Sequence, residues 1–93
     1  MNEMTIKKLL EDEERDECEL IKKYIVSDPE ILLGVPVIKG TRISVPLILE
    51  MLASGMKIDE IASVLNIPKE SIIAAIIYAK RLVEGMNVEV SSG

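Results

Sequence analysis

The stretch that decides the fold runs from residue 58 to residue 85 and reads IDEIASVLNIPKESIIAAIIYAKRLVEG. Apolar residues recur every three or four positions in both of its halves, which predicts helices at about 58–65 and 68–84. Asn66 can adopt the left-handed conformation that ends the first helix, and Pro68 suits the first turn of the second. Two helices joined by so short a turn indicate a helix-turn-helix arrangement.

A third helix and a small β ribbon are predicted upstream of this pair. Ser44 is a suitable N-cap and Gly55 is a suitable terminator, which places a helix at about 45–54. The apolar runs 24–26 and 37–38 are separated by turn residues and predict two short strands. Because a two-stranded ribbon is marginal alone, we expect helices or a second chain to cover it.

The first 23 residues are rich in charge, with eight acidic and five basic residues. Apolar residues at helical spacing within them predict a helix at about 3–23. The charges indicate a solvent-exposed helical face or, alternatively, an arm that folds on a partner. The chain is therefore divided into an acidic N-terminal helix or arm (1–23), a helical domain with its ribbon (24–85) and a C-terminal strand or tail (86–93).

The composition excludes several kinds of site. The chain has 93 residues, no histidine and a single cysteine, Cys18. Sites built from His and Cys ligands therefore cannot form, and nucleophiles that need a histidine base lack it. The apolar 48% of the chain contains no Phe or Trp, so the core must be aliphatic. We expect a single domain with no enzymatic activity, no cofactor and no metal.

Net charge and hydropathy restrict the partners and the location. The formal charge of −5 argues against a broad nucleic-acid surface but leaves room for a local basic patch. The longest apolar run, residues 72–79, is too short for a membrane span of about 20 residues. The N-terminus has no features of a secretory signal, so we expect a cytoplasmic protein without a membrane partner.

The helix at 68–84 is apolar over most of its circumference, which is more than a lone domain of three helices needs to bury. Such a surface usually marks an interface, and we expect a homodimer. The alternative is that the N-terminal helix and the ribbon cover the surface within the same chain. The residues predicted for this dimer or partner interface are Ile73, Ala74, Ile77, Tyr78 and Arg81.

DNA is a second candidate partner, because the later helix of a helix-turn-helix enters the major groove by its N-terminal residues. The candidate DNA contacts are Lys57, Lys69, Ser71, Lys39 and Arg42, whereas Glu70 opposes the approach of phosphate. The turn at Gly40 precedes a helix start and could hold an anion. The alternative interpretations are that these residues are ordinary surface charges and that the turn is purely structural.

The stretch 25–83 resembles the bacterial and archaeal domain-of-unknown-function family 433. The resemblance rests on a run with fixed spacing, Gly-x-Pro-x-Ile-x-Gly-Thr-Arg-Ile-x-Val, whose family-motif residues here include Gly34, Pro36, Gly40, Thr41 and Arg42. It implies a mainly α fold, with a homeodomain-like three-helix helix-turn-helix core and a short β element before it. The helix predicted at 3–23 is an extra N-terminal helix outside the matched stretch.

Members of this family look like VapB-type antitoxins, which are encoded beside PIN-like ribonuclease toxins. The resemblance therefore implies an antitoxin-like component of a type II toxin-antitoxin system, which binds and neutralises such a toxin and takes operator DNA as a second ligand. Two alternatives stay open. One is a stand-alone DNA-binding transcriptional regulator, and the other is a dimeric interaction module with no nucleic-acid role.

Overall fold

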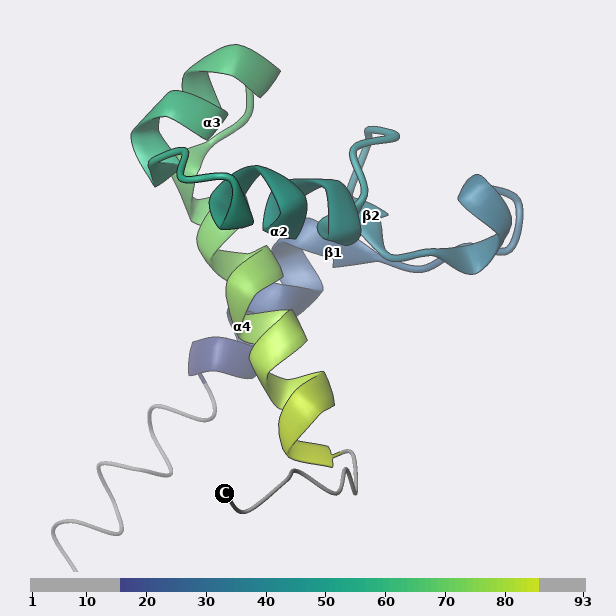
Figure 1. Ribbon diagram of the computed structural model, residues 1–93. Coiled ribbons are helices and arrows are strands. Elements are labelled where there is room, and N and C mark those ends of the chain that lie inside the picture. The colour runs from purple at the N-terminus through teal and green to yellow at the C-terminus, as the bar shows by residue number, and fades with distance from the viewer. Residues whose placement is uncertain (1–15, 86–93) are drawn as a thin grey trace, which may run out of the picture.

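The computed structural model describes residues 16–85, and this part of the chain is mainly helical (Figure 1). It holds four helices and one sheet of two strands. In chain order the elements are a helix over residues 16–24, β1 (Ile25–Val26), the short 3-10 turn η1 (Leu32–Gly34), β2 (Val37–Ile38), α2 (Val45–Ala53), α3 (Ile58–Leu65) and α4 (Lys69–Gly85).

The helices predicted at 45–54, 58–65 and 68–84 are confirmed to within one residue at each end. The predicted strands are also confirmed, except that Tyr24 ends the N-terminal helix and does not begin β1. The part of the predicted helix that precedes residue 16, and the strand or tail at 86–93, lie outside the described residues.

Local side-chain chemistry sets the helix ends. The Oγ of Ser44 accepts a hydrogen bond from the backbone N–H of Leu47 at 3.1 Å, which caps α2 as the sequence predicts. At the start of α3, the backbone N–H of Lys57 donates to Oε1 of Glu60 at 3.2 Å. Asn66 ends α3 in the left-handed conformation, with φ 54° and ψ 50°.

The ribbon is antiparallel, with Ile25 opposite Ile38 and Val26 opposite Val37. Lys39, just after β2, fastens the ribbon to the N-terminal helix in two ways. Its backbone N–H donates to the carbonyl oxygen of Tyr24 at 2.7 Å, and its Nζ donates to the carbonyl oxygen of Lys22 at 3.0 Å. A cation that binds the last carbonyls of a helix stabilises the helix end, so Lys39 holds this junction together.

The core is aliphatic, as the composition predicts, and lies where the first half of α4 meets α2, α3 and β1. Ile48, Ile61 and Ile72 come from three different helices and are completely buried. Burying each such side chain stabilises the fold by roughly 1.5–3 kcal/mol. Figure 1 shows that α4 extends well beyond α2 and α3, which leaves Leu82 and Val83 exposed near its end.

Within residues 16–85, no single helix is both long enough and apolar enough to cross a membrane. Taken together, α3 and α4 are long enough and apolar enough for a membrane span. The chain, however, bends by 116° between them.

Candidate functional site

The run from Gly34 to Val45 forms a rigid turn between the ribbon and α2. Gly40 has φ +80°, a conformation that favours glycine. The backbone N–H and the Oγ1 hydroxyl of Thr41 both donate to the carbonyl oxygen of Ile38, at 3.0 and 2.8 Å. Its Oγ1 also accepts from the N–H of Ile43 at 3.0 Å, so Gly40 and Thr41 together build the turn.

Gly34 and Pro36 have structural roles in the same run. Gly34 has φ +87°, and its carbonyl oxygen accepts from the Oγ of Ser27 at 2.5 Å. The carbonyl oxygen of Pro36 accepts from the N–H of Val45 at 2.9 Å, which joins the ribbon to the first turn of α2. Arg42 differs from these residues, because its side chain is exposed and makes no hydrogen bond or ion pair within residues 16–85.

The predicted DNA contacts are not brought together into one basic surface. Lys57 and Lys69 are exposed, but Nζ of Lys69 lies 3.2 Å from Oδ1 of Asp59. The exposed acid Glu70 follows Lys69 directly. Lys39 is engaged at the end of the N-terminal helix, as described above. The lysines at this end of the molecule are therefore interleaved with carboxylates.

The prediction of Ser71 as a DNA contact needs correction. Ser71 is completely buried, and its hydroxyl donates to the carbonyl oxygen of Pro68 at 2.6 Å. The hydroxyl serves the first turn of α4 and does not reach the surface. We therefore remove Ser71 from the candidate nucleic-acid contacts.

The predicted interface on α4 is divided between three environments. Ala74 is completely buried in the core of its own chain, so its assignment to an intermolecular surface is wrong. Tyr78 packs against the same core, and Arg81 faces the N-terminal helix. Ile73 and Ile77 are half-buried and are not among the apolar residues of 16–85 that pack on the core. These two are the predicted interface residues that lie outside the core cluster and its packed neighbours.

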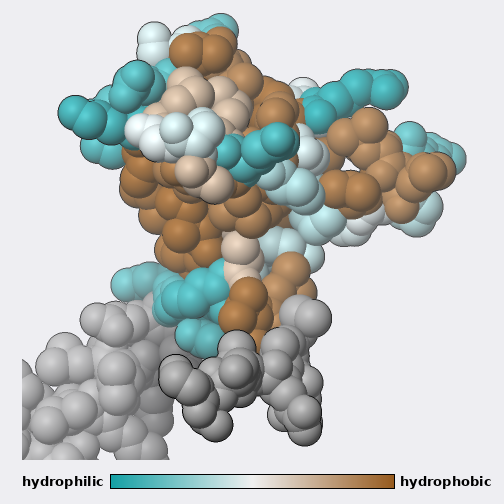
Figure 2. All heavy atoms as spheres, viewed as in Figure 1, coloured by the Kyte–Doolittle hydropathy of each residue, from teal (hydrophilic) through white to brown (hydrophobic). Residues whose placement is uncertain are grey.

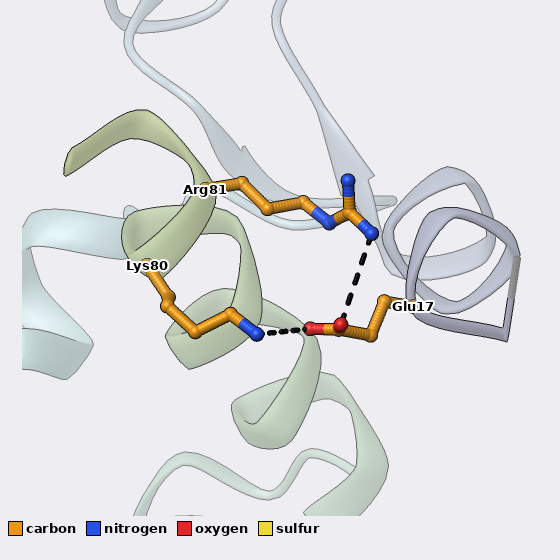
Figure 3. Close-up of polar contacts among 3 residues, drawn as sticks. All are labelled: Glu17, Lys80 and Arg81. Atoms are coloured by element: carbon orange, nitrogen blue, oxygen red, sulfur yellow. Dashed lines mark hydrogen bonds and ion pairs between the residues drawn. The ribbon is translucent and has the colours of Figure 1, made fainter. Parts of the chain in front are cut away.

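An ion-pair cluster joins the second half of α4 to the N-terminal helix (Figure 3). Nζ of Lys80 lies 2.7 Å from Oε2 of Glu17, and Nη2 of Arg81 lies 3.8 Å from Oε1 of the same carboxylate. The hydrogen bond from Lys80 lowers the pKa of Glu17, and burial opposes that shift. The hydrogen bond to Glu17 raises the pKa of Lys80 in return. The cluster attaches the N-terminal helix to the second half of α4.

The most unusual surface is the apolar loop, which we define as residues 27–36 between β1 and β2. It projects away from the helices in Figure 1, and Figure 2 shows a hydrophobic tip there. Leu33 is 96% exposed and Leu32 is 41% exposed. Both leucines have positive φ values, 56° and 47°, which cost roughly 1–2 kcal/mol per residue for side chains of this kind.

Backbone hydrogen bonds hold the apolar loop in this shape. The N–H of Ile31 donates to the carbonyl oxygen of Asp28 at 2.9 Å, and the N–H of Gly34 donates to that of Ile31 at 3.1 Å. The N–H of Glu30 also donates to Oδ1 of Asp28 at 2.9 Å. We did not predict this surface from the sequence. Its available signal is an adjacent pair of leucines between an Asp-Pro turn and a Gly-x-Pro turn.

Metal chemistry finds no support in the described residues. They contain no group of three or more Asp, Glu, Cys or His side chains that could hold a metal ion. Cys18 is exposed and free.

Comparison with known proteins gives one match. A family model described as "Protein of unknown function (DUF433)" matches residues 25–79, which are 55 of the 93 residues and more than half of the chain. The match covers the ribbon, the apolar loop, α2, α3 and most of α4. No curated protein and no solved structure matches the chain.

Proposed function

The chain belongs to the DUF433 family, and on that premise we propose that it is an antitoxin-like interaction module of a type II toxin-antitoxin system. In this proposal it binds and neutralises a PIN-like ribonuclease toxin. The module is a cytoplasmic homodimer built on a homeodomain-like helix-turn-helix core.

The observation that carries the proposal is the apolar loop. Exposing Leu33 to water forfeits the roughly 1.5–3 kcal/mol that its burial would contribute. The left-handed backbone at Leu32 and Leu33 adds a conformational cost at the same place. Backbone strain of this kind clusters at binding sites, where the surrounding structure maintains it. A partner protein that buries both leucines would recover the lost hydrophobic stabilisation.

Charge supports a basic protein as the partner. The chain carries 16 acidic and 11 basic residues, for a formal charge of −5. A ribonuclease binds its RNA substrate through positively charged surface. Opposite charge between two partners speeds their encounter and excludes wrong partners. An acidic module that docks by an apolar loop therefore fits a basic ribonuclease.

The test is inhibition of RNA cleavage by the PIN-like nuclease encoded in the neighbouring gene. The wild-type chain should form a stable complex and stop cleavage. Leu33→Asn should weaken inhibition by about tenfold or more, the equivalent of ~1.4 kcal/mol of lost contact. Val64→Asn is a matched control, because Val64 is an exposed apolar residue on α3 outside the apolar loop.

Two results would overturn the proposal. One is the absence of any complex between the wild-type chain and the nuclease. The other is full inhibition by Leu33→Asn, which would show that the apolar loop is not the docking surface. Circular dichroism on both variants establishes that each is folded before inhibition is compared.

A stand-alone transcriptional regulator is the second candidate, and the geometry of α3 and α4 favours it. The 116° between them lies within the range of about 90–120° for helix-turn-helix units. Lys57 and Lys69 are exposed near the turn, and Arg42 is exposed beside α2. Affinity for DNA upstream of the gene should fall steeply with salt and drop in Lys69→Ala. If the chain binds the nuclease and no DNA, it is an interaction module without a nucleic-acid role.

A further inference from the structure

The exposed apolar surface of the loop continues onto the first turn of α2. The carbonyl oxygen of Pro36 accepts from the N–H of Val45 at 2.9 Å, which holds the end of the loop against the start of α2. Val35 immediately precedes this contact and Leu47 closely follows it, and these two side chains are 37% and 40% exposed. The exposed apolar residues of the two segments therefore form one surface. We call it the apolar strip, and its residues are Leu32, Leu33, Val35, Pro46 and Leu47.

A carboxylate lies at each end of the apolar strip. Glu30 precedes Leu32 in the loop, and Glu50 lies one helical turn after Leu47 on α2. Both glutamate side chains are exposed, and neither makes a hydrogen bond or an ion pair within residues 16–85. Exposed apolar surface rimmed by charged residues is typical of a protein interface.

The cations of this region lie away from the apolar strip. Val37 pairs with Ser44, so residues 36–45 form a hairpin whose closed end carries Lys39 and Arg42. The apolar strip lies at the open end of this hairpin. At roughly 3.3 Å of rise per residue along a strand, the two ends are about 13 Å apart. The charge beside the apolar strip is therefore negative.

We propose that the apolar strip and its two flanking glutamates form one docking surface for a protein that presents an apolar pocket between basic side chains. Leu33 lies at the projecting hydrophobic tip (Figure 2) and enters the pocket, while the rest of the strip packs against its rim. Lysine or arginine side chains of the partner pair with Glu30 and Glu50. This inference rests on the proposed function, in which the partner is a basic nuclease, and adds a second contact on α2.

Charge disfavours the other occupants of the apolar strip. A second copy of the chain would bring its own glutamates toward Glu30 and Glu50, and like charges across an interface cost affinity. The same carboxylates repel the phosphates of nucleic acids and of anionic lipids. Figure 1 also shows that the loop projects beyond the helices, a shape that fits a pocket better than a flat surface.

The contact on α2 is tested by the binding kinetics of the full chain and the nuclease encoded in the neighbouring gene. Leu47→Gln should raise the Kd by about fivefold or more through faster dissociation, because the variant loses apolar contact with the partner. Glutamine is a good helix former, and circular dichroism checks that the variant is folded. Val64→Gln is the matched control, because Val64 is an exposed apolar residue of α3, and its Kd should equal that of the wild type.

The flanking glutamates are tested by charge reversal in the same measurement. Glu30→Lys and Glu50→Lys should each slow association by about threefold or more at low salt, because each puts a cation opposite the basic rim of the pocket. The difference from the wild type should shrink as salt is added. Glu70→Lys makes the same charge change on an exposed residue of α4. Its association rate should stay within about twofold of the wild-type rate.

Three results would overturn the inference, and each has a different meaning. If only Leu33→Asn binds weakly and the variants at Leu47, Glu30 and Glu50 bind as the wild type does, the docking surface ends at the loop and the proposed function stands. If the wild-type chain never binds the nuclease, the proposed function falls and this inference falls with it. If sedimentation equilibrium shows self-association that Leu47→Gln abolishes, the apolar strip belongs to a second copy of the chain.

Discussion

Nζ of Lys80 lies 2.7 Å from Oε2 of Glu17, which ties α4 to a helix 63 residues earlier in the chain. Lys80 belongs to the second half of α4, where the helix has passed α2 and α3 (Figure 1). Arg81 approaches the same carboxylate from the next position. The N-terminal helix is thus attached at both ends. Ion pairs join its first described turn to α4, and the hydrogen bond from Lys39 joins its last turn to the ribbon.

The Glu17–Lys80 pair predicts how stability varies with pH. The folded protein has a lowered pKa at Glu17, so the stabilisation is present above the ordinary value of 4.5 and is lost as pH falls through the lowered pKa. Lys80 has a raised pKa in the folded protein. The stabilisation that its charge contributes is therefore present below the ordinary value of 10.5 and is lost as pH rises through the raised pKa. Between these values the contribution of the pair should be constant.

Urea unfolding of the wild type and Glu17→Gln measures this dependence. The difference in free energy of unfolding should be small at neutral pH, because the Lys80 side chain of the pair is half exposed. The difference should disappear at pH values well below 4.5. Glu50→Gln on α2 is the control and should show no pH-dependent difference from the wild type. A difference for Glu17→Gln that persists in acid would contradict the assignment of the ion pair.

Gly40→Ala should destabilise the fold by about 1–2 kcal/mol, because the new side chain must adopt a left-handed backbone. A Cβ added at Gly40 meets no atom within 4 Å, so conformation and not crowding sets the cost. Gly85→Ala is the matched control, since Gly85 also has open space around it but has no positive φ. Its effect should stay within about 0.5 kcal/mol. Equal effects of the two changes in urea unfolding would show that the turn is not strained.

Local signals account for the parts of the fold that the sequence could predict. Ser44 begins α2 through a hydrogen bond to a residue three positions away, and Asn66 ends α3 through its own left-handed backbone conformation. The same holds for Gly40, whose turn is closed within four residues. Such features depend only on the residues of a short segment. They can therefore be predicted from the sequence without knowledge of the tertiary packing.

Long-range packing determines the parts that the sequence could not predict. Ala74 and Ile73 are neighbours in an apolar run, yet Ala74 is completely buried and Ile73 is only half-buried. The difference depends on where α2 and the N-terminal helix contact α4. The exposure of Leu33 was also missed, because apolar residues are expected inside unless a partner covers them.

Leu33→Asn should keep or raise the stability of the isolated chain. Asparagine tolerates the left-handed conformation better than leucine, and Leu33 has almost no buried surface to lose. We expect a gain of about 0.5–1 kcal/mol in the free energy of unfolding. Val35→Asn should show no gain, because Val35 has φ −63° and is partly covered. A clear loss of stability in Leu33→Asn would mean that Leu33 packs within its own chain.

Two variants at the start of α4 distinguish a structural role from a DNA-binding role. Ser71→Ala tests the structural role of a buried hydroxyl, and Lys69→Ala tests DNA binding by an exposed ammonium group. Ser71→Ala removes a buried hydrogen bond to the carbonyl oxygen of Pro68 and should cost about 1 kcal/mol of stability. Its affinity for DNA should equal that of the wild type at temperatures where both are folded. Lys69→Ala should have little effect on stability, because its pair with Asp59 is exposed.

Fluorescence anisotropy with DNA from upstream of the gene, measured over a range of salt, completes this comparison. If the chain binds DNA by α4, Lys69→Ala lowers the affinity and reduces the slope of its dependence on salt by about one. Ser71→Ala leaves both quantities unchanged, because a completely buried hydroxyl cannot reach a base or a phosphate. A loss of affinity in Ser71→Ala without loss of stability would require the first turn of α4 to open on DNA. That result would contradict the buried position of Ser71.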